Sequence, residues 1–299
     1  MGPNPPGPPS LSGKGGAGGW LRRASPPSRT GRGAGGVGHR VMRELLQRLL
    51  FGLLRLVCRP LRIEGVERLR GLEPPFLLVA NHASHLDTLL ILMALPPGLR
   101  RRMAVAAAAD YWFARPLLGG LAALLVNAFP MARRGCARAG LAACQALAEA
   151  GWALLVFPEG TRSPDGRPQP FKPGAGRLAV ELGLPVVPVA LVGSHACLPR
   201  GARWPRPGAA AVVFGAPLRF PANLSRDAAT LHITNAVHML HSNANRGASI
   251  GRGSRSAAPR ASGGERSDGD NTGDHDPVQR GRRAAQSAVQ DPAPWPLRV

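Results

Sequence analysis

The sequence predicts an α/β fold in which a mostly parallel central sheet is flanked by helices. Two observations lead to this prediction. Short apolar runs typical of buried strands alternate with segments of helical periodicity, and this order favours parallel strands joined by helices. Polar residues also gather directly after two of the strands, where sheets of this class usually bind their ligands.

The folded domain is expected to occupy residues 41–242 of the 299. Residues 1–40 contain 19 Gly or Pro, six basic residues and no acidic residue. Such a composition buries too little apolar surface to offset the entropy of an ordered chain. Residues 243–299 are rich in Gly, Ser, Arg and Asp. We therefore predict a disordered tail at each end and a single domain between them.

The formal net charge of +21 fits a nucleic acid, an anionic membrane surface or an anionic substrate as partner. Only Lys14 and Lys172 among the 38 basic residues are lysines, so a coding bias toward Arg explains part of the charge. Aromatic residues make up only 5% of the chain, which leaves few platforms for stacking nucleic-acid bases. We therefore predict no nucleic-acid partner. The four cysteines lack paired spacing, so we expect free thiols and no metal site.

Residues 41–60 are predicted to form an amphipathic helix at a membrane interface. From 42 to 57, leucines occupy one side, whereas Arg43, Gln47, Arg48 and Arg55 occupy the other. The segment is too short and too charged to span a bilayer, and the N-terminus does not read as a signal peptide. Periodicity alone leaves two alternatives open: a helix lying in the membrane interface, or a helix packed on its own domain.

The remaining elements follow in order. The apolar stretch 116–130 is also too short to span a membrane and predicts either a buried helix or a hairpin that dips into the membrane. Helices are expected at 88–95, 137–150 and 177–182. Strands are expected at 76–80, 153–157, 185–192 and 209–214.

His82 and Asp87 stand five residues apart between the first predicted strand and the helix that follows it. At this spacing the carboxylate can bind one ring nitrogen and leave the other to take a proton from a hydroxyl group. An alternative reading is a helix cap, because Ser84 and Asp87 also fit a capping box. A second motif, 157–163, follows the strand at 153–157 and places a carboxylate, a glycine, a hydroxyl and a guanidinium in one turn.

Four blocks of the sequence resemble the glycerophospholipid acyltransferases, in particular the 1-acylglycerol-3-phosphate acyltransferases. They are 81–87 (NHASHLD), 129–133 (FPMAR), 157–163 (FPEGTRS) and 187–190 (VPVA), and the resemblance covers roughly residues 62–220. By this resemblance His82 is the general base and Asp87 orients it. The base would activate the free hydroxyl of an acceptor lipid to attack an acyl thioester, carried on coenzyme A or on acyl carrier protein. The resemblance implies no cofactor and no metal.

The resemblance also implies roles for the other block residues. Arg133 and Arg162 would clamp the phosphate of the acceptor, and Lys172 would be a further phosphate contact. Arg134 is a rival to Arg133, because Ala132 stands where relatives often carry Asp. Further residues would shape the acceptor site and the pocket wall: Glu159, Gly160, Thr161 and Pro188. His85 and His195 receive no role.

The sequence therefore predicts an enzyme that acylates 1-acylglycerol 3-phosphate to make phosphatidate, associated with the cytoplasmic face of the inner membrane. The same chemistry on a lysophospholipid or on glycerol 3-phosphate is the nearest alternative. A non-catalytic, membrane-associated basic protein is an alternative of a different class.

Overall fold

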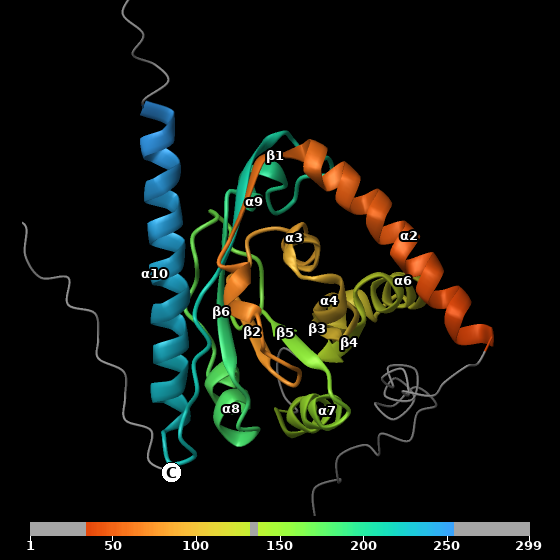
Figure 1. Cartoon of the computed structure of the whole chain (residues 1–299), viewed down its shortest axis with the longest axis vertical. Coiled ribbons are helices and arrows are strands. Elements are labelled where there is room, and N and C mark those ends of the chain that lie inside the picture. Colours follow the sequence, from red (N-terminus) through yellow and green to blue (C-terminus); the bar gives the residue numbers. More distant parts are fainter. Residues whose placement is uncertain (1–33, 132–136, 254–299) are drawn as a thin grey trace, which may run out of the picture. The chain divides into compact units, whose positions relative to one another are not determined.

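The computed structural model describes residues 34–131 and 137–253, and within them seven strands form one sheet (Figure 1). The strand order is β1-β7-β6-β2-β5-β3-β4. Every neighbouring pair is parallel except β6 and β7, which are antiparallel. The predicted fold class is therefore confirmed. The strands are β1 (Cys58–Glu64), β2 (Leu77–Ala80), β3 (Met103–Ala108), β4 (Ala128–Met131), β5 (Ala153–Val156), β6 (Val186–Val192) and β7 (Gly208–Phe214).

Helices cover both faces of this sheet. Among the described residues they are α2 (Ala34–Val57), the 3-10 helix η1 (Val66–Leu69), α3 (Asp87–Ala94), α4 (Pro97–Arg101), α5 (Ala109–Trp112), α6 (Pro116–Val126), α7 (Ala137–Glu149), α8 (Gly174–Glu181), α9 (Ser194–Cys197) and α10 (Arg226–Gly253).

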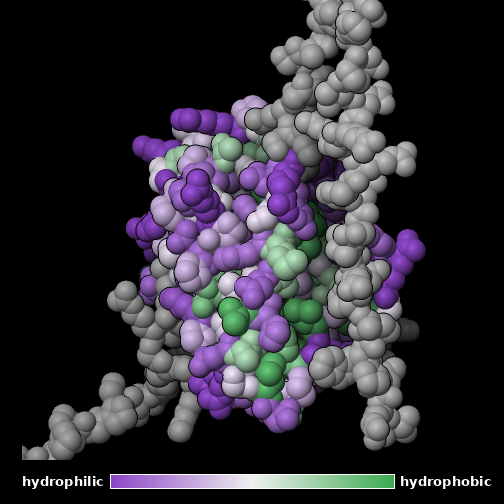
Figure 2. Space-filling view, turned by 90° about the vertical axis from the view of Figure 1, so that its left-hand side faces the viewer, coloured by the Kyte–Doolittle hydropathy of each residue, from purple (hydrophilic) through white to green (hydrophobic). Residues whose placement is uncertain are grey.

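Alternate side chains of each strand point to opposite faces, which divides the core into two layers. On β2, Leu78 and Ala80 join the layer that contains α2 and α3. Leu77 and Val79 join the layer that contains α7, α8 and α10. The side that carries α10 is largely hydrophilic, with apolar residues interspersed (Figure 2).

Two of the expected domain boundaries lie elsewhere in the structure. Helix α2 begins at Ala34, inside the tail expected over 1–40, and α10 continues to Gly253, past the expected boundary at 243. Residue 244 is even part of the core, because the side chain of Ala244 is only 7% exposed. The rest of both predicted tails, 1–33 and 254–299, lies outside the described residues.

Three strands of the sheet were not expected from the sequence: β1, β3 and β4. Strands β1 and β4 lie at the two edges of the sheet. Each contains a proline, Pro60 and Pro130, which an edge strand tolerates but which weakens a sequence-based strand prediction. Strand β3 reads MAVAAA, and alanine favours helices over strands. The stretch 116–130 was expected to form either one buried helix or one hairpin that dips into the membrane. It forms helix α6 followed by strand β4 instead.

Helix α2 packs on the domain through one side and leaves a stripe of apolar residues exposed on the other. Gln47, Phe51 and Leu54 are its buried residues, and Gln47 Nε2 donates to the carbonyl of Leu125 in α6 at 2.6 Å. Five apolar side chains on the outer side are between 52% and 62% exposed: Met42, Leu45, Leu49, Leu53 and Leu56. We call these five residues the α2 stripe. Of the helices in the described part of the chain, none is long and apolar enough to cross a membrane.

Candidate active site

Two neighbouring strands bring the two main sequence motifs together. Strand β2 pairs with β5 in parallel, and Val79 is the register partner of Val156. Both strands end at the same edge of the sheet, so the turns 81–87 and 157–163 begin side by side. Backbone hydrogen bonds then tie the turns to each other, since the N–H of Ser163 donates to the carbonyl of His82 at 2.8 Å.

His82 and Asp87 form the pair that their spacing predicts. His82 Nδ1 lies 2.9 Å from Asp87 Oδ2, and the side chain of Asp87 is completely buried. The same oxygen accepts the backbone N–H groups of Ala83 at 2.6 Å and Ser84 at 2.8 Å. An ionised carboxylate accepts these bonds, so Nδ1 of His82 carries the proton that it donates. This arrangement leaves Nε2 as the proton-accepting nitrogen.

Buried polar residues hold the His82–Asp87 turn in place. The side chain of Asn81 is fully buried and makes two hydrogen bonds to Leu191 of β6: Nδ2 donates to its carbonyl at 2.9 Å, and Oδ1 accepts its N–H at 2.8 Å. Ser84 Oγ donates to the carbonyl of Leu198 at 2.9 Å. Asp87 is the first residue of α3, whose N-cap residue Leu86 makes no side-chain capping bond. Of the predicted capping box, only the bond from the N–H of Ser84 to Asp87 Oδ2 forms.

Glu159 holds the backbone of His82 and does not line the cavity. The resemblance implied instead that Glu159 shapes the acceptor site. Its side chain is only 5% exposed, and Oε1 accepts the backbone N–H of His82 at 3.0 Å. Burial raises the pKa of this carboxyl to about 8, although hydrogen bonds from the N–H groups of His82 and Gln169 act in the opposite direction. Glu159 therefore holds a proton at neutral pH, and it positions the backbone of the histidine.

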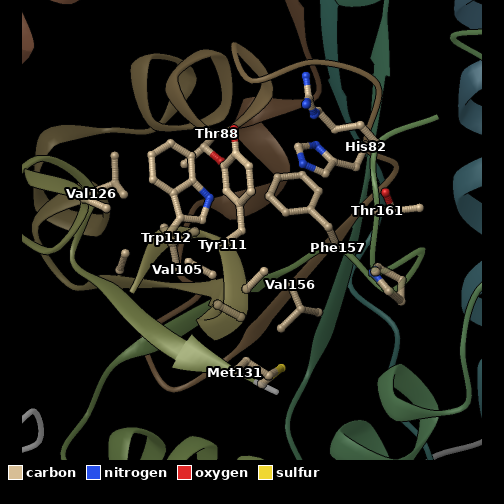
Figure 3. A pocket seen from close by; sticks show the side chains of 18 of the residues that line it. His82, Thr88, Val105, Tyr111, Trp112, Val126, Met131, Val156, Phe157 and Thr161 are labelled. Atoms are coloured by element: carbon tan, nitrogen blue, oxygen red, sulfur yellow. The ribbon is translucent and has the colours of Figure 1, made fainter. Parts of the chain in front are cut away.

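A cavity of about 630 Å³ opens in front of His82, a size typical of sites for small molecules. One part of its wall is apolar and comes from α3, β3 and α6, with Leu89, Val105, Leu121, Leu125 and Val126. The ring of Phe157 stacks on that of His82 with centroids 4.3 Å apart. Figure 3 shows these two rings beside Tyr111 in the cavity.

Four side chains of the cavity lining are cationic. They are Arg162, Lys172, Arg177 and Arg200. Nε of Arg177 donates to Glu181 Oε1 at 2.9 Å, so part of its charge is balanced within the protein. Guanidinium and ammonium groups bind phosphate oxygens well. The cavity therefore suits an amphiphile that has an apolar chain and an anionic head.

Gly160 and Lys172 fit closely together at the cavity. Gly160 has a φ of 72°, which favours glycine, and a Cβ added there would lie 2.6 Å from Nζ of Lys172. The third-block residues Gly160, Thr161 and Arg162 all line the cavity, as the resemblance implies.

His85 is not the partner of Asp87, and it belongs to an aromatic group that lines the cavity. Its ring lies 5.8 Å from the ring of Tyr111 and 5.7 Å from that of Trp112. Burial first, and then the charge of Arg162, lowers the pKa of His85 to about 4. His85 is therefore uncharged at neutral pH. His195, which received no role, packs with its Cβ against Gly166.

Three residues expected in the site are either placed differently or lie outside the described residues. Pro188 lies within β6, where its carbonyl accepts the N–H of Gly215 at 2.8 Å, and it is not part of the cavity wall. Its expected role in the pocket wall is therefore wrong. Arg133 and Arg134 fall in 132–136, outside the described residues, so their role stays a prediction. Met131, directly before that segment, lines the cavity.

Sequence reasoning missed Arg200, Arg177 and Tyr111 as cavity residues. Arg200 lies in the segment after α9, and nothing in the local sequence distinguishes it from the many other arginines. Tyr111 is the single tyrosine of the chain, and this could have drawn attention to it. Within 34–131 and 137–253, no three His, Cys, Asp or Glu side chains gather in a way that could hold a metal ion.

Comparisons with known proteins agree with this site. Residues 60–192 match the family model described as Acyltransferase. A 1-acyl-sn-glycerol-3-phosphate acyltransferase of Brassica napus (BAT2, chloroplastic) is 33% identical over 141 residues, which are 46% of this chain and 39% of the relative. The 1-acyl-sn-glycerol-3-phosphate acyltransferase of Cocos nucifera is 30% identical over 193 residues, 63% of this chain and 58% of the relative. The chain thus spans about half the length of the curated relatives it matches.

A solved structure is similar in fold. The crystal structure of the 1-acyl-sn-glycerophosphate (LPA) acyltransferase PlsC from Thermotoga maritima has a TM-score of 0.55 and 24% sequence identity. The similarity covers 74% of this chain and 85% of the other.

Proposed function

We propose that this chain, whose residues 60–192 match the family model described as Acyltransferase, moves a fatty acyl group from an acyl thioester to 1-acylglycerol 3-phosphate. The product would be phosphatidate. The observation that carries this proposal is the bond of 2.9 Å between His82 Nδ1 and Asp87 Oδ2 at a cavity lined by both apolar and cationic side chains. The relatives are named for the same acceptor.

In the proposed mechanism, Nε2 of His82 removes the proton from the free hydroxyl of the acceptor. The oxygen attacks the thioester carbon, a C–O bond forms and the C–S bond breaks. The protonated imidazole returns the proton to the departing thiolate. Asp87 stabilises the imidazolium between these steps, and its buried position keeps the ring in one orientation. Neither an acyl-enzyme nor a cofactor takes part in this scheme.

The apolar and the cationic side chains of the cavity would bind different parts of the acceptor. Arg162 and Lys172, with Arg200, would bind the phosphate of the acceptor, whereas the leucines of α3 and α6 would contact an acyl chain. An acceptor that already carries one acyl chain uses both sets of side chains. This favours 1-acylglycerol 3-phosphate over glycerol 3-phosphate.

The α2 stripe supports association with a membrane surface. The domain packs on the buried edge of α2, so the apolar side chains of the stripe face away from the domain. Helix α6, which contacts α2, adds Leu117 at 89% exposure. We propose that both helices rest in the membrane interface, where the acceptor and the product reside. The cytoplasmic face of the inner membrane stays a prediction.

The test is acyl transfer from labelled acyl-CoA, and separately from acyl carrier protein, to a panel of acceptors. The panel contains 1-acylglycerol 3-phosphate, glycerol 3-phosphate and lysophosphatidylglycerol. We expect activity on the first, loss of turnover in His82→Ala, and normal turnover in His232→Ala, a control at an exposed histidine of α10. Transfer to another acceptor would correct the substrate, and retained activity in His82→Ala would remove His82 from the mechanism. Absence of transfer with both donors would favour the non-catalytic alternative.

A further inference from the structure

The segment 199–207, which joins α9 to β7, presents a tryptophan among arginines to solvent. It reads PRGARWPRP and contains no acidic residue. The side chain of Trp204 is 80% exposed, and Arg200, Arg203 and Arg206 are exposed as well. The ion pairs found between described residues include none of these three arginines. We call this segment the Trp204 loop.

One backbone hydrogen bond closes a turn within the loop, and a second ties the loop to α9. The N–H of Ala202 donates to the carbonyl of Pro199 at 3.1 Å, and the N–H of Arg206 donates to the carbonyl of Cys197 at 2.7 Å. Cys197 is fully buried, and its Sγ donates to the carbonyl of Gly208 at 3.3 Å. Trp204 lies between the bonded residues Ala202 and Arg206, so an ordered backbone holds its side chain in the exposed position.

The fold puts this loop next to the C-terminal end of α2, although the two are far apart in the sequence. Cys58 directly follows α2, and its register partner is Gly208, which directly follows the loop. Leu56, the last residue of the α2 stripe, lies two residues before that pairing. The loop therefore borders the surface that we propose to rest on the membrane.

The loop also reaches the active site. Arg200 lines the cavity that contains His82. Leu198, just before the loop, accepts a hydrogen bond from Ser84 Oγ in the turn that carries His82. One end of the loop is thus at the cavity, and the other is at the end of α2.

We propose that the Trp204 loop is a second membrane contact of this chain, which docks on the surface of an anionic phospholipid bilayer. Trp204 enters the boundary between head groups and acyl chains, where the indole ring places its apolar body and its N–H favourably. Arg203 and Arg206 pair with lipid phosphates. Arg200 then faces the phosphate of an acceptor at the cavity. This proposal extends the proposed function, because it names the surface that brings the cavity to its lipid.

An acidic protein such as acyl carrier protein is the rival partner for a basic loop. The bilayer is favoured for two reasons. The loop adjoins exposed leucines, which suit hydrocarbon better than an acidic protein surface. Its exposed large apolar side chain is also a tryptophan, the residue typical of membrane interfaces.

The test measures binding of the full-length protein to vesicles of phosphatidylcholine, with and without phosphatidylglycerol, by co-sedimentation. The double variant Arg203→Ala/Arg206→Ala should bind anionic vesicles about 10- to 30-fold more weakly, because each arginine near such a surface contributes roughly fivefold. The matched control is Arg167→Ala/Arg219→Ala, which removes two exposed arginines elsewhere. Trp204→Ala should bind both kinds of vesicle more weakly, and Leu231→Ala on α10 should bind as the wild type does.

A second measurement follows the environment of Trp204 directly, through tryptophan fluorescence. Fluorescence emission should move to shorter wavelength on anionic vesicles in the wild type, and this shift should shrink in Trp204→Phe. Wild-type binding by both the double variant and Trp204→Ala would overturn the proposal, and so would an emission shift caused by acyl carrier protein but not by vesicles. Vesicle binding is independent of turnover. A chain that binds vesicles through the loop but transfers no acyl group would refute the proposed function and leave this proposal standing.

Discussion

The turn after β2 and the turn after β5 begin side by side but are built in opposite ways. In the first turn the polar side chains of Asn81, Ser84 and Asp87 are all buried and bonded within the protein. In the second, Thr161 is exposed and lines the cavity with Arg162, while Glu159 and Ser163 are buried. The difference indicates that the first turn fixes the position of His82, whereas the second offers groups to a ligand.

The largest expected effect is on the first turn. Asp87→Asn keeps the shape of the side chain but loses the charge that stabilises the imidazolium and fixes its tautomer. We expect kcat to fall by about 10³- to 10⁴-fold, with a melting temperature within a few degrees of the wild type. Steady-state kinetics and thermal unfolding followed by circular dichroism measure the two quantities. A fall of less than tenfold would mean that Asp87 holds the turn without taking part in the reaction.

The next largest effect concerns the buried hydrogen bonds that hold this turn in place. Asn81→Ala leaves the N–H and the carbonyl of Leu191 without their buried partner, so we expect the free energy of unfolding to fall by about 2–4 kcal/mol. Chemical denaturation measures this loss. Asn235→Ala, at an exposed position of α10, is the control and should change stability by less than about 0.5 kcal/mol. Equal effects of the two variants would show that the first turn does not depend on its buried bonds.

A substitution in the second turn should weaken binding of the acceptor. Arg162→Ala removes a cationic group from the cavity wall, so we expect KM for 1-acylglycerol 3-phosphate to rise about 10- to 100-fold with a much smaller change in kcat. Monoacylglycerol, which lacks the phosphate, should show no such change. Arg167→Ala is the control, because Arg167 is exposed outside the cavity. An unchanged KM for the phosphate-bearing acceptor would refute the clamp.

The smallest effect concerns Glu159, a buried residue of the second turn. Burial raises its pKa from the ordinary value of 4.5 to about 8. Between these values the folded protein keeps a proton that the unfolded chain has lost, so this group makes stability fall as pH rises through that window. Glu159→Gln stays uncharged. Its melting temperature relative to the wild type should therefore rise by a few degrees between about pH 5 and about pH 9.

Thermal unfolding of Glu159→Gln and the wild type across this range measures the difference. A pH-independent difference would show that the carboxyl is ionised throughout the range. The same variant should keep KM for the acceptor, because Glu159 positions the backbone of His82 and does not line the cavity.

The α/β class and the two motif turns were predictable because they depend on local information. Apolar runs of four or five residues mark β2 and β5 as buried strands, and the spacing of His82 and Asp87 already brings their side chains together within one turn. Edge strands carry weaker signals, which is why β1 and β4 escaped prediction. The antiparallel pairing of β6 with β7 was likewise not predicted.

The sequence by itself determined the candidate groups of this protein: a histidine with its carboxylate, a motif rich in binding groups, and a leucine-rich amphipathic helix. Only the tertiary structure decided how these parts are used. In the tertiary structure, Glu159 is buried, Pro188 lies outside the cavity wall and Arg200 lines the cavity. The α2 stripe faces away from the domain. The physical reason is that spacing along the chain determines contacts within a turn or helix, whereas burial and cavity walls depend on elements that meet only when the sheet assembles.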